Sequence, residues 1–457
     1  MAPRTHNSPR RLKLTGFDII SAKDKNRGAM RERRYMNALP LLALGSMAAL
    51  TPAAFAQQPR PAVSSGAAGS TQQYTPSGQA ASQSGEAQGG GMVLKLMDLD
   101  ISVRPSVKLD VQHNDNIYST PNNKTGDQIL VLTPALTLMT KQGTNSFSLR
   151  MSSAIGQYQN HASDNYTNNS INGLADFDLG TRLRANLRGD YIDGVDPRGS
   201  TNNPLSSTPD RYRHTYGQGI VSYGASGAQG RVDIELGRLQ RDYLNNRATT
   251  AGSDRLVDDI GATFRWRLGP KTELIFQGKH SDVKYSLASS TLGSVENMFL
   301  AGATWEASAK TTGTFRFGMV KKDFDDSTRG NSTALSWSGD VRWSPLTYSH
   351  VNLTLNRAPA ETTGGVGNFI DRTATSVRWT HSWSSRLTSE ALASYMTDAY
   401  QGADRTDNTQ KLGLKATYKM RRWLDFGADY ALTARSSSNN NFDFKSNVFM
   451  LFLNAAL

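Results

Sequence analysis

The chain has 457 residues, 37% of them hydrophobic, and contains no cysteine. This composition excludes a bundle of membrane-spanning helices, and the missing thiols exclude cysteine nucleophiles and cysteine-ligated metals and favour an envelope protein. The net charge of +12 does not indicate nucleic-acid binding, because residues 1–35, with ten Lys/Arg against three Asp/Glu, account for +7 of it.

The N-terminal part predicts a secretory signal peptide over residues 1–56. A basic segment, an apolar run and a small-residue cleavage site follow one another as Arg31-Glu32-Arg33-Arg34, Leu39 to Leu50 and Ala54-Phe55-Ala56. The apolar run is too short for a membrane-spanning anchor. Residues 1–29, ahead of Met30, are interpreted as a misassigned start or an extended basic region.

A flexible linker is predicted over residues 57–100. Its first 35 residues are rich in Gly, Ser, Gln and Ala and have almost no aromatic side chains, so they cannot build a core. The segment is read as a spacer, with a tether to a periplasmic partner as the alternative.

The remainder, residues 101–457, alternates between apolar and polar side chains with a period of two. Successive side chains of a strand point to opposite faces, so this period predicts strands. The expected strands are 106–112, 130–138, 147–155, 171–179, 183–191, 212–223, 231–236, 259–268, 272–279, 297–306, 312–322, 335–344, 350–356, 373–383, 387–395, 411–419, 424–432 and 447–457.

One hairpin, residues 171–192, shows the pattern most clearly. A short break at Gly180-Thr181 separates two alternating runs and indicates a turn. One register that matches the two apolar faces sets Asp178 opposite Arg184 and Phe177 opposite Ala185. One face of the hairpin is then charged and self-neutralising, and the other is apolar.

The connections between these strands alternate in length. Eight short turns lie between nine longer loops rich in Asn, Asp, Ser, Thr and Gly, which requires eighteen strands with both chain ends on the short-turn side. Outer-membrane barrels have this arrangement. We predict an all-β fold, a transmembrane antiparallel up-and-down β-barrel of about eighteen strands. A soluble alternative would need a second sheet over every apolar face.

The tryptophans support the same prediction. Six of the seven lie within a few residues of an expected short turn, and Trp337 does not. Aromatic side chains gather where a barrel meets the membrane interface. The expected periplasmic girdle consists of Trp266, Trp305, Trp343, Trp379, Trp383 and Trp423.

The polar faces of the strands would line a lumen that carries both signs of charge, wide enough in an eighteen-stranded barrel for water. These residues are candidates for a cargo path, although the wall of any porin would look similar. The expected lumen-lining residues are Asp176, Asp178, Arg184, Arg188, Asp233, Glu235, Arg265, Arg267, Lys279, Arg316, Asp340, Arg342, Arg378, Glu390, Lys411, Lys415, Asp425 and Asp429.

Tyrosines gather on the side of the long loops, where they could stack on sugars or form an interfacial belt. They are Tyr118, Tyr158, Tyr166, Tyr212, Tyr216, Tyr243 and Tyr285. Catalysis is not expected, because no histidine has the spacing of a metal pair or a Ser/His/acid context, and no phosphate-binding glycine loop occurs. We expect no enzyme, cofactor or metal.

Segments near the first strands resemble the putative beta-barrel porin 2 family. They are SVKLDVQHNDNIYST (106–120), GDQILVLTPALTL (126–138) and the stretch 156–199, and the likeness extends over about 100–457. Asn114-Asp115-Asn116 stands where the family has Asp-Asp-Asn, and Pro134-Ala135 where it has Pro-Gly. The family lies in the outer membrane and often accompanies exopolysaccharide synthesis and secretion.

The resemblance therefore implies an outer-membrane channel for exopolysaccharide or capsule export, with polysaccharide as cargo and periplasmic export or co-polymerase proteins as further partners. The alternative is a general or substrate-selective diffusion porin for small hydrophilic solutes. Either function implies that the protein itself is secreted through the inner membrane and assembled by the barrel-assembly machinery. It would then contact outer-membrane lipid and lipopolysaccharide. Neither involves nucleic acid.

Overall fold

A computed structural model of the protein describes residues 19–20, 91–96, 99–200, 206–225, 227–308, 310–363 and 365–456. The predicted signal peptide and the predicted linker as far as residue 90 lie outside these residues, apart from Ile19 and Ile20.

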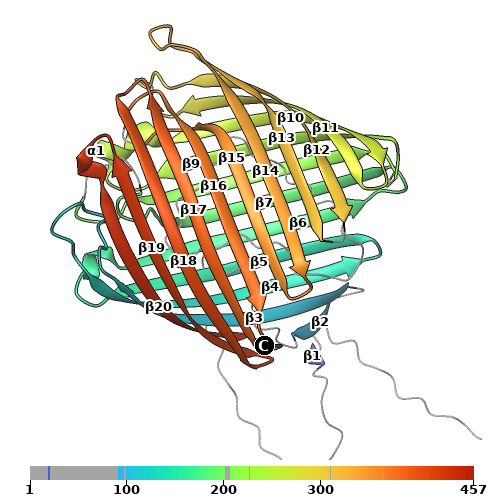
Figure 1. Ribbon diagram of the computed structural model, residues 1–457, viewed down its shortest axis with the longest axis horizontal. Helices are drawn as coiled ribbons and strands as arrows, with labels where there is room; N and C mark the ends of the chain where they lie inside the picture. Colours follow the sequence, from blue (N-terminus) through green and yellow to red (C-terminus); the bar gives the residue numbers. More distant parts are fainter. Residues whose placement is uncertain are drawn as a thin grey trace, which may run out of the picture.

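One antiparallel sheet closes on itself to form a barrel of eighteen strands, as the alternating pattern predicts (Figure 1). The strands of the ring are β3 (Leu99–Asn114), β4 (Asp127–Gln142), β5 (Asn145–Tyr158), β6 (Tyr166–Asp178), β7 (Leu183–Val195), β8 (Arg211–Tyr223), β9 (Gly230–Tyr243), β10 (Arg255–Gly269), β11 (Thr272–Tyr285), β12 (Ser294–Ser308), β13 (Thr311–Phe324), β14 (Ser332–Leu346), β15 (Ser349–Ala360), β16 (Phe369–Ser382), β17 (Leu387–Gln401), β18 (Arg405–Arg421), β19 (Leu424–Ser437) and β20 (Phe444–Ala456).

The ring closes where β20 pairs with β3. Leu453 lies opposite Leu109 and Leu451 opposite Val111, and the pairing is antiparallel because the number of strands is even. Every strand of the ring therefore has a hydrogen-bonded neighbour on both sides. No edge is left along most of the wall, as a barrel in lipid requires.

The predicted register of the hairpin formed by β6 and β7 is confirmed. Asp178 lies opposite Arg184, and Phe177 lies opposite Ala185. Because side chains alternate in each strand, this pairing keeps the apolar set of both strands on one face of the sheet.

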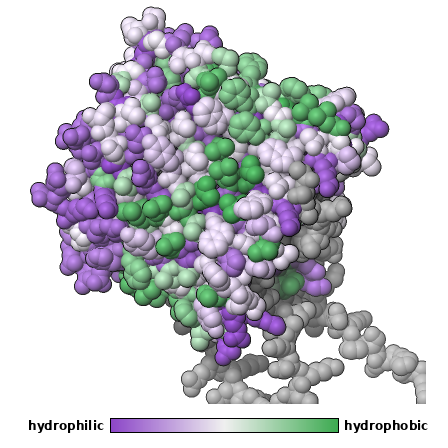
Figure 2. All heavy atoms as spheres, in the orientation of Figure 1, coloured by the Kyte–Doolittle hydropathy of each residue, from purple (hydrophilic) through white to green (hydrophobic). Residues whose placement is uncertain are grey.

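The two faces of the sheet differ in chemistry. Large apolar side chains such as Phe299, Leu414 and Leu236 are exposed on one face, with 69%, 62% and 58% of their surface accessible. Figure 2 shows such side chains across the outer wall, with hydrophilic ones gathered where the long loops lie at the left. A monomeric soluble protein rarely exposes so large an apolar surface, which fits a wall in contact with lipid.

The charged face is the concave one. Arg316 of β13 donates a hydrogen bond of 2.7 Å to Gln277 of β11, across the intervening strand. Arg231 of β9 likewise lies 4.0 Å from Glu273 of β11. Side chains converge in this way only on the inner side of a curved sheet, so the charged face lines the lumen.

Short turns connect the strands at one end of the barrel, which we call the turn end. They span 143–144, 179–182, 224–229, 270–271, 309–310, 347–348, 383–386 and 422–423. Gly143, with a φ of +60°, supplies the left-handed conformation that such a tight turn needs.

The opposite loop end carries the connections 115–126, 159–165, 196–210, 244–254, 286–293, 325–331, 361–368, 402–404 and 438–443. Loop 402–404 is shorter than expected, because β18 begins at Arg405, six residues before the expected strand. Its first residues are polar and resemble a loop in sequence. The loop end also holds α1 (Arg247–Thr250) and three 3-10 helices, Ala162–Asp164, Ala251–Ser253 and Asn440–Phe442.

Among the helices of the described residues, none combines the length and the apolar character needed to cross a membrane.

The sheet begins earlier than the expected linker boundary at residue 100. Strand β2 (Met92–Leu96) pairs with the first residues of β3, and β1 (Ile19–Ile20) pairs with β2. The apolar segment MVLKL allows this, because it can form a strand although it follows a glycine-rich stretch. β2 pairs with residues of β3 that precede Ser106 in the sequence, where β20 no longer pairs with β3.

Candidate functional site

The lumen wall over β9, β10 and β11 is a network of ion pairs. Arg265 Nε lies 2.8 Å from Asp233 Oδ2, and Lys279 Nζ lies 3.0 Å from Asp259 Oδ2. Lys279 Nζ also lies 3.9 Å from Glu235 Oε1 on β9. The alternation along each strand places all five side chains on the concave face, and pairing offsets the cost of burying their charges. This part of the wall is therefore nearly neutral.

The wall over β14, β15 and β16 is more open. Arg342, Asn352 and Arg378 lie in one row across the three strands. Arg378 Nη1 donates a hydrogen bond of 3.0 Å to Glu390 Oε2 on β17. Arg342 has no carboxylate partner among the described residues, and it is exposed like Asp340 two positions earlier. Charged groups here remain exposed towards the lumen.

The structure places every residue expected to line the lumen on the concave face. These residues are Asp176, Asp178, Arg184, Arg188, Asp233, Glu235, Arg265, Arg267, Lys279, Arg316, Asp340, Arg342, Arg378, Glu390, Lys411, Lys415, Asp425 and Asp429. Their role as a cargo path stays a prediction.

Only part of this set is brought together in ion pairs. Asp178 and Arg184 face each other in register, yet no ion pair joins them. Sequence reasoning left out Lys108 and Asp110, which form a pair 2.8 Å long on β3, although both lie on the polar face that the alternation already indicates. Applying the alternation to every charged residue of the strands would have included them.

The six tryptophans of the expected girdle lie near the turn end. Trp383 and Trp423 lie in short turns and the other four lie close to strand ends, whereas Trp337 lies further along β14. The indole nitrogens of Trp379 and Trp383 donate hydrogen bonds to Ser349 and Ser389. An apolar ring whose polar edge is hydrogen-bonded suits a membrane interface. That the girdle faces the periplasm stays a prediction.

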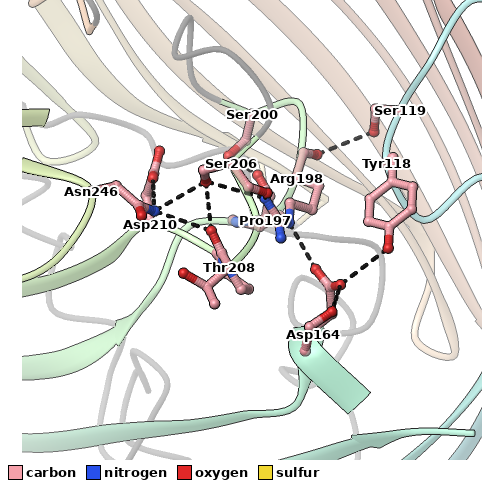
Figure 3. Close-up of polar contacts among 12 residues, drawn as sticks. Tyr118, Ser119, Asp164, Pro197, Arg198, Ser200, Ser206, Thr208, Asp210 and Asn246 are labelled. Carbon is pink, nitrogen blue, oxygen red and sulfur yellow. Dashed lines mark hydrogen bonds and ion pairs between the residues drawn. The ribbon is translucent and has the colours of Figure 1, made fainter. Parts of the chain in front are cut away.

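At the loop end, three loops meet around Arg198 (Figure 3). Arg198 Nε lies 2.7 Å from Asp164 Oδ1, and Tyr118 donates its hydroxyl hydrogen to Asp164 Oδ2 at 3.2 Å. The Arg198 guanidinium also lies 5.7 Å from the centre of the Tyr118 ring. Burial and the Asp164 carboxylate raise the pKa of the Tyr118 hydroxyl, which keeps it a neutral donor. We call these three residues the Arg198 cluster.

The same loop is tied to the next one through Asn246, which precedes α1 (Figure 3). The Asn246 amide donates hydrogen bonds to Asp210 Oδ1 at 2.7 Å and to Ser206 Oγ at 3.0 Å. Arg198 Nη1 donates to the Ser206 carbonyl at 2.6 Å. Loops 115–126, 159–165, 196–210 and 244–254 thus form a continuous polar network.

A second network surrounds Lys322 on β13. Lys322 Nζ lies 2.6 Å from Glu296 Oε1 and 2.7 Å from Glu361 Oε1, and Tyr285 donates a hydrogen bond to Glu361. Burial would raise the pKa of Glu361, but Lys322 and Arg255 outweigh burial and hold it below its ordinary value. This carboxylate therefore stays ionised and anchors loop 361–368 to the lumen wall.

The tyrosines of the loop end are packed beneath the loops instead of forming an exposed surface. Tyr212 and Tyr243 are buried, and the Arg241 guanidinium lies 3.9 Å from the centre of the Tyr212 ring. Arg241 also pairs with Asp196 at 2.8 Å. For these two rings, neither sugar stacking nor an outward belt fits. Among the described residues, no group of three His, Asp or Glu side chains could hold a metal ion.

A family model described as "Putative beta-barrel porin 2" matches residues 101–457, which is the ring of strands except for the first two residues of β3. Among curated proteins, none matches this sequence.

Several solved structures are similar to this chain at low sequence identity. The outer membrane protein opdK from Pseudomonas aeruginosa is 13% identical with a TM-score of 0.44, over 78% of this chain and 99% of that one. OccAB3 from Acinetobacter baumannii is 11% identical with a TM-score of 0.44, over 79% and 100%. The FrpB iron transporter from Neisseria meningitidis is 12% identical with a TM-score of 0.41, over 73% of this chain, which spans 62% of FrpB.

Proposed function

Because the chain belongs to the putative beta-barrel porin 2 family, we propose that it forms a water-filled outer-membrane channel through which small hydrophilic solutes diffuse. The observation that carries this proposal is the chemistry of the two faces of the ring. Eighteen strands leave room for water, charged side chains line the concave face, and apolar side chains cover the outside. The family description names a porin, which favours transport over catalysis.

Reconstitution in a planar lipid bilayer tests the proposal. We expect discrete, steady conductance steps that increase in proportion to the KCl concentration, and swelling of proteoliposomes in isotonic solutions of small sugars. Protein refolded without detergent or lipid is the control. Properly folded protein that never raises the conductance of the bilayer would contradict the proposal.

Export of exopolysaccharide, the more specific function implied by the resemblance, receives less support than diffusion. The family description names a porin and no polymer. The loops are also held to one another and to the wall by buried charged groups, such as Arg198 with Asp164 and Lys322 with Glu361. Deletion of the gene decides between the two functions: loss of surface polysaccharide with unchanged solute uptake would favour export.

We further propose that the mature protein lies in the outer membrane, in contact with its lipid and lipopolysaccharide. It would reach this membrane through the predicted signal peptide and the barrel-assembly machinery. The exposed apolar wall supports this location, and fractionation of the envelope tests it.

A further inference from the structure

The members of the ion pairs on the lumen wall are not equally exposed. Arg188 is 40% exposed and its partner Asp190 only 10%, and Arg378 is 31% exposed against 6% for Glu390. The same order holds for three more pairs: Lys108 with Asp110, Arg231 with Asp233, and Arg267 with Glu273. In each of these pairs the basic group is nearer to the water and the acidic group is nearer to the sheet.

Side-chain length explains the order. Asp and Glu have short side chains that stay close to the backbone, whereas Arg and Lys carry their charge on long, flexible stems that extend into water. Pairs with little exposure show the opposite order, as with Lys279 and Asp259 at 2% and 10% and Arg231 and Glu273 at 14% and 16%, but their acidic members extend little into the lumen.

A solute in the lumen therefore meets basic groups first. The two charges of a pair do not cancel at short range, because the Coulomb energy falls with distance and the basic group is the nearer one, so each pair acts as a dipole with its positive end towards the lumen. Pairs that are neutral as a whole thus present a positive surface to the channel.

The row of Arg342, Asn352 and Arg378 strengthens this surface. Arg342 forms no ion pair with a described residue, so its charge is not compensated by a direct partner. Asp340 is exposed nearby and accepts a hydrogen bond of 3.1 Å from Thr354, which reduces the positive potential without removing the excess of exposed basic groups along the wall.

We propose that the lumen selects for anions, and that solutes carrying carboxylate or phosphate groups pass in preference to cations of similar size. Arg188, Arg342 and Arg378 are the specificity-determining residues. This inference rests on the proposed channel function and adds the class of solute to it.

The absence of cysteine allows a test that does not depend on conductance. Asn352→Cys introduces one thiol between the two arginines of the row. Methanethiosulfonate reagents of equal size and opposite charge are added to proteoliposomes, and the rates are compared with those of free cysteine. We expect the negative reagent to be favoured by about threefold or more, because the nearby basic groups attract it and repel the positive reagent.

Arg342→Gln in the same background should reduce this preference, and it leaves no carboxylate without its partner. The matched control is Lys321→Gln, which removes a basic group from the outer face. Any of four results would overturn the inference. The thiol could prefer the positive reagent, react with both at equal rates, or react with neither. The Lys321→Gln control could also lower the preference as much as Arg342→Gln does.

Reversal potentials in a KCl gradient complete the test. Wild type should conduct chloride in preference to potassium, and Arg188→Gln with Arg342→Gln should lower that preference. If the protein conducts steadily but prefers cations, the proposed anion selectivity is wrong and the proposed channel stands. If it does not conduct but its thiol favours the negative reagent, the proposed diffusion channel is wrong and the positive lumen surface stands.

Discussion

Arg198 and Asp164 form an almost fully buried ion pair between two loops, with the Arg198 Nε atom 2.7 Å from Asp164 Oδ1 and side-chain exposures of 9% and 3%. Tyr118 from a third loop contacts both members. This charged contact therefore joins loops 115–126, 159–165 and 196–210 to one another, while the strands below are held by their own hydrogen bonds.

We expect Arg198→Gln to loosen this end of the protein without unfolding the barrel. Removing one member of a buried pair costs about 3–5 kcal/mol, because the other charge stays buried and unpaired. Hydrogen exchange should rise in residues 115–126 and 196–200 while the strands stay protected. Lys321→Gln, which opens the exposed pair with Asp323, is the control and should leave the loops unchanged. Unaltered exchange in the Arg198 variant would show that the pair does not order the loops.

The Lys322 network predicts a dependence of stability on pH. The pKa of Glu361 is lowered in the folded protein, so its contribution is present above the ordinary value of 4.5 and is lost as the pH falls through the folded value. We expect the free energy of unfolding in lipid vesicles to decrease below about pH 4.5.

Lys322→Met should destabilise the protein at pH 7 by about 3–5 kcal/mol, because two buried carboxylates lose their cation. Those carboxylates then favour the protonated state, so the difference from wild type should shrink towards pH 4. Urea titrations at both pH values measure it, with Lys321→Met on the outer face as control. If the stability difference between wild type and Lys322→Met did not change with pH, Lys322 would not be the group that keeps the two carboxylates ionised.

Glycines in the strands are expected to differ sharply in their tolerance of alanine. A Cβ on Gly318 would lie 1.9 Å from the Phe299 carbonyl oxygen of the neighbouring strand, whereas a Cβ on Gly217 meets nothing within 4 Å. Gly318→Ala must therefore force β12 and β13 apart, and Gly217→Ala should be nearly neutral. The fraction of folded, heat-modifiable barrel on a gel compares them. Equal yields would contradict the close approach of the two strands.

Charge on the two faces should have opposite consequences. Leu414 is 62% exposed on the outer wall, and Leu414→Arg should cost about 2–4 kcal/mol in a bilayer, since an arginine near the midplane loses its hydration. Ser376→Arg adds the same side chain to the lumen, where water remains, and should cost much less. Folding free energies in vesicles of matched thickness provide the measurement. A larger cost at Ser376 would reverse the assignment of inside and outside.

The predicted signal peptide implies that the mature protein begins at Gln57. Edman or mass-spectrometric sequencing of protein isolated from the outer membrane should find this N-terminus, because the small-residue site Ala54-Phe55-Ala56 fits signal peptidase. Isolated protein that retains residues 31–56 would reject the prediction.

The sequence by itself determined the class of fold, the number of strands, the two faces of the sheet and one register. The alternation of apolar and polar residues is a local property that can be read from each strand separately. The two apolar runs of one hairpin therefore suffice to predict the pairing of Asp178 with Arg184. Strand ends were less predictable. The polar residues Thr406 to Gln410 look like a loop in sequence, yet they continue β18 beyond the apolar wall.

Only the tertiary structure decided which charged groups meet. Lys322 reaches Glu361 although two whole strands, β14 and β15, lie between them in the chain, and Arg316 reaches Gln277 across an intervening strand. Such contacts depend on the curvature and stagger of the closed ring, which no short stretch of sequence contains. For the same reason, only the folded ring shows that Arg378 extends further into the lumen than Glu390.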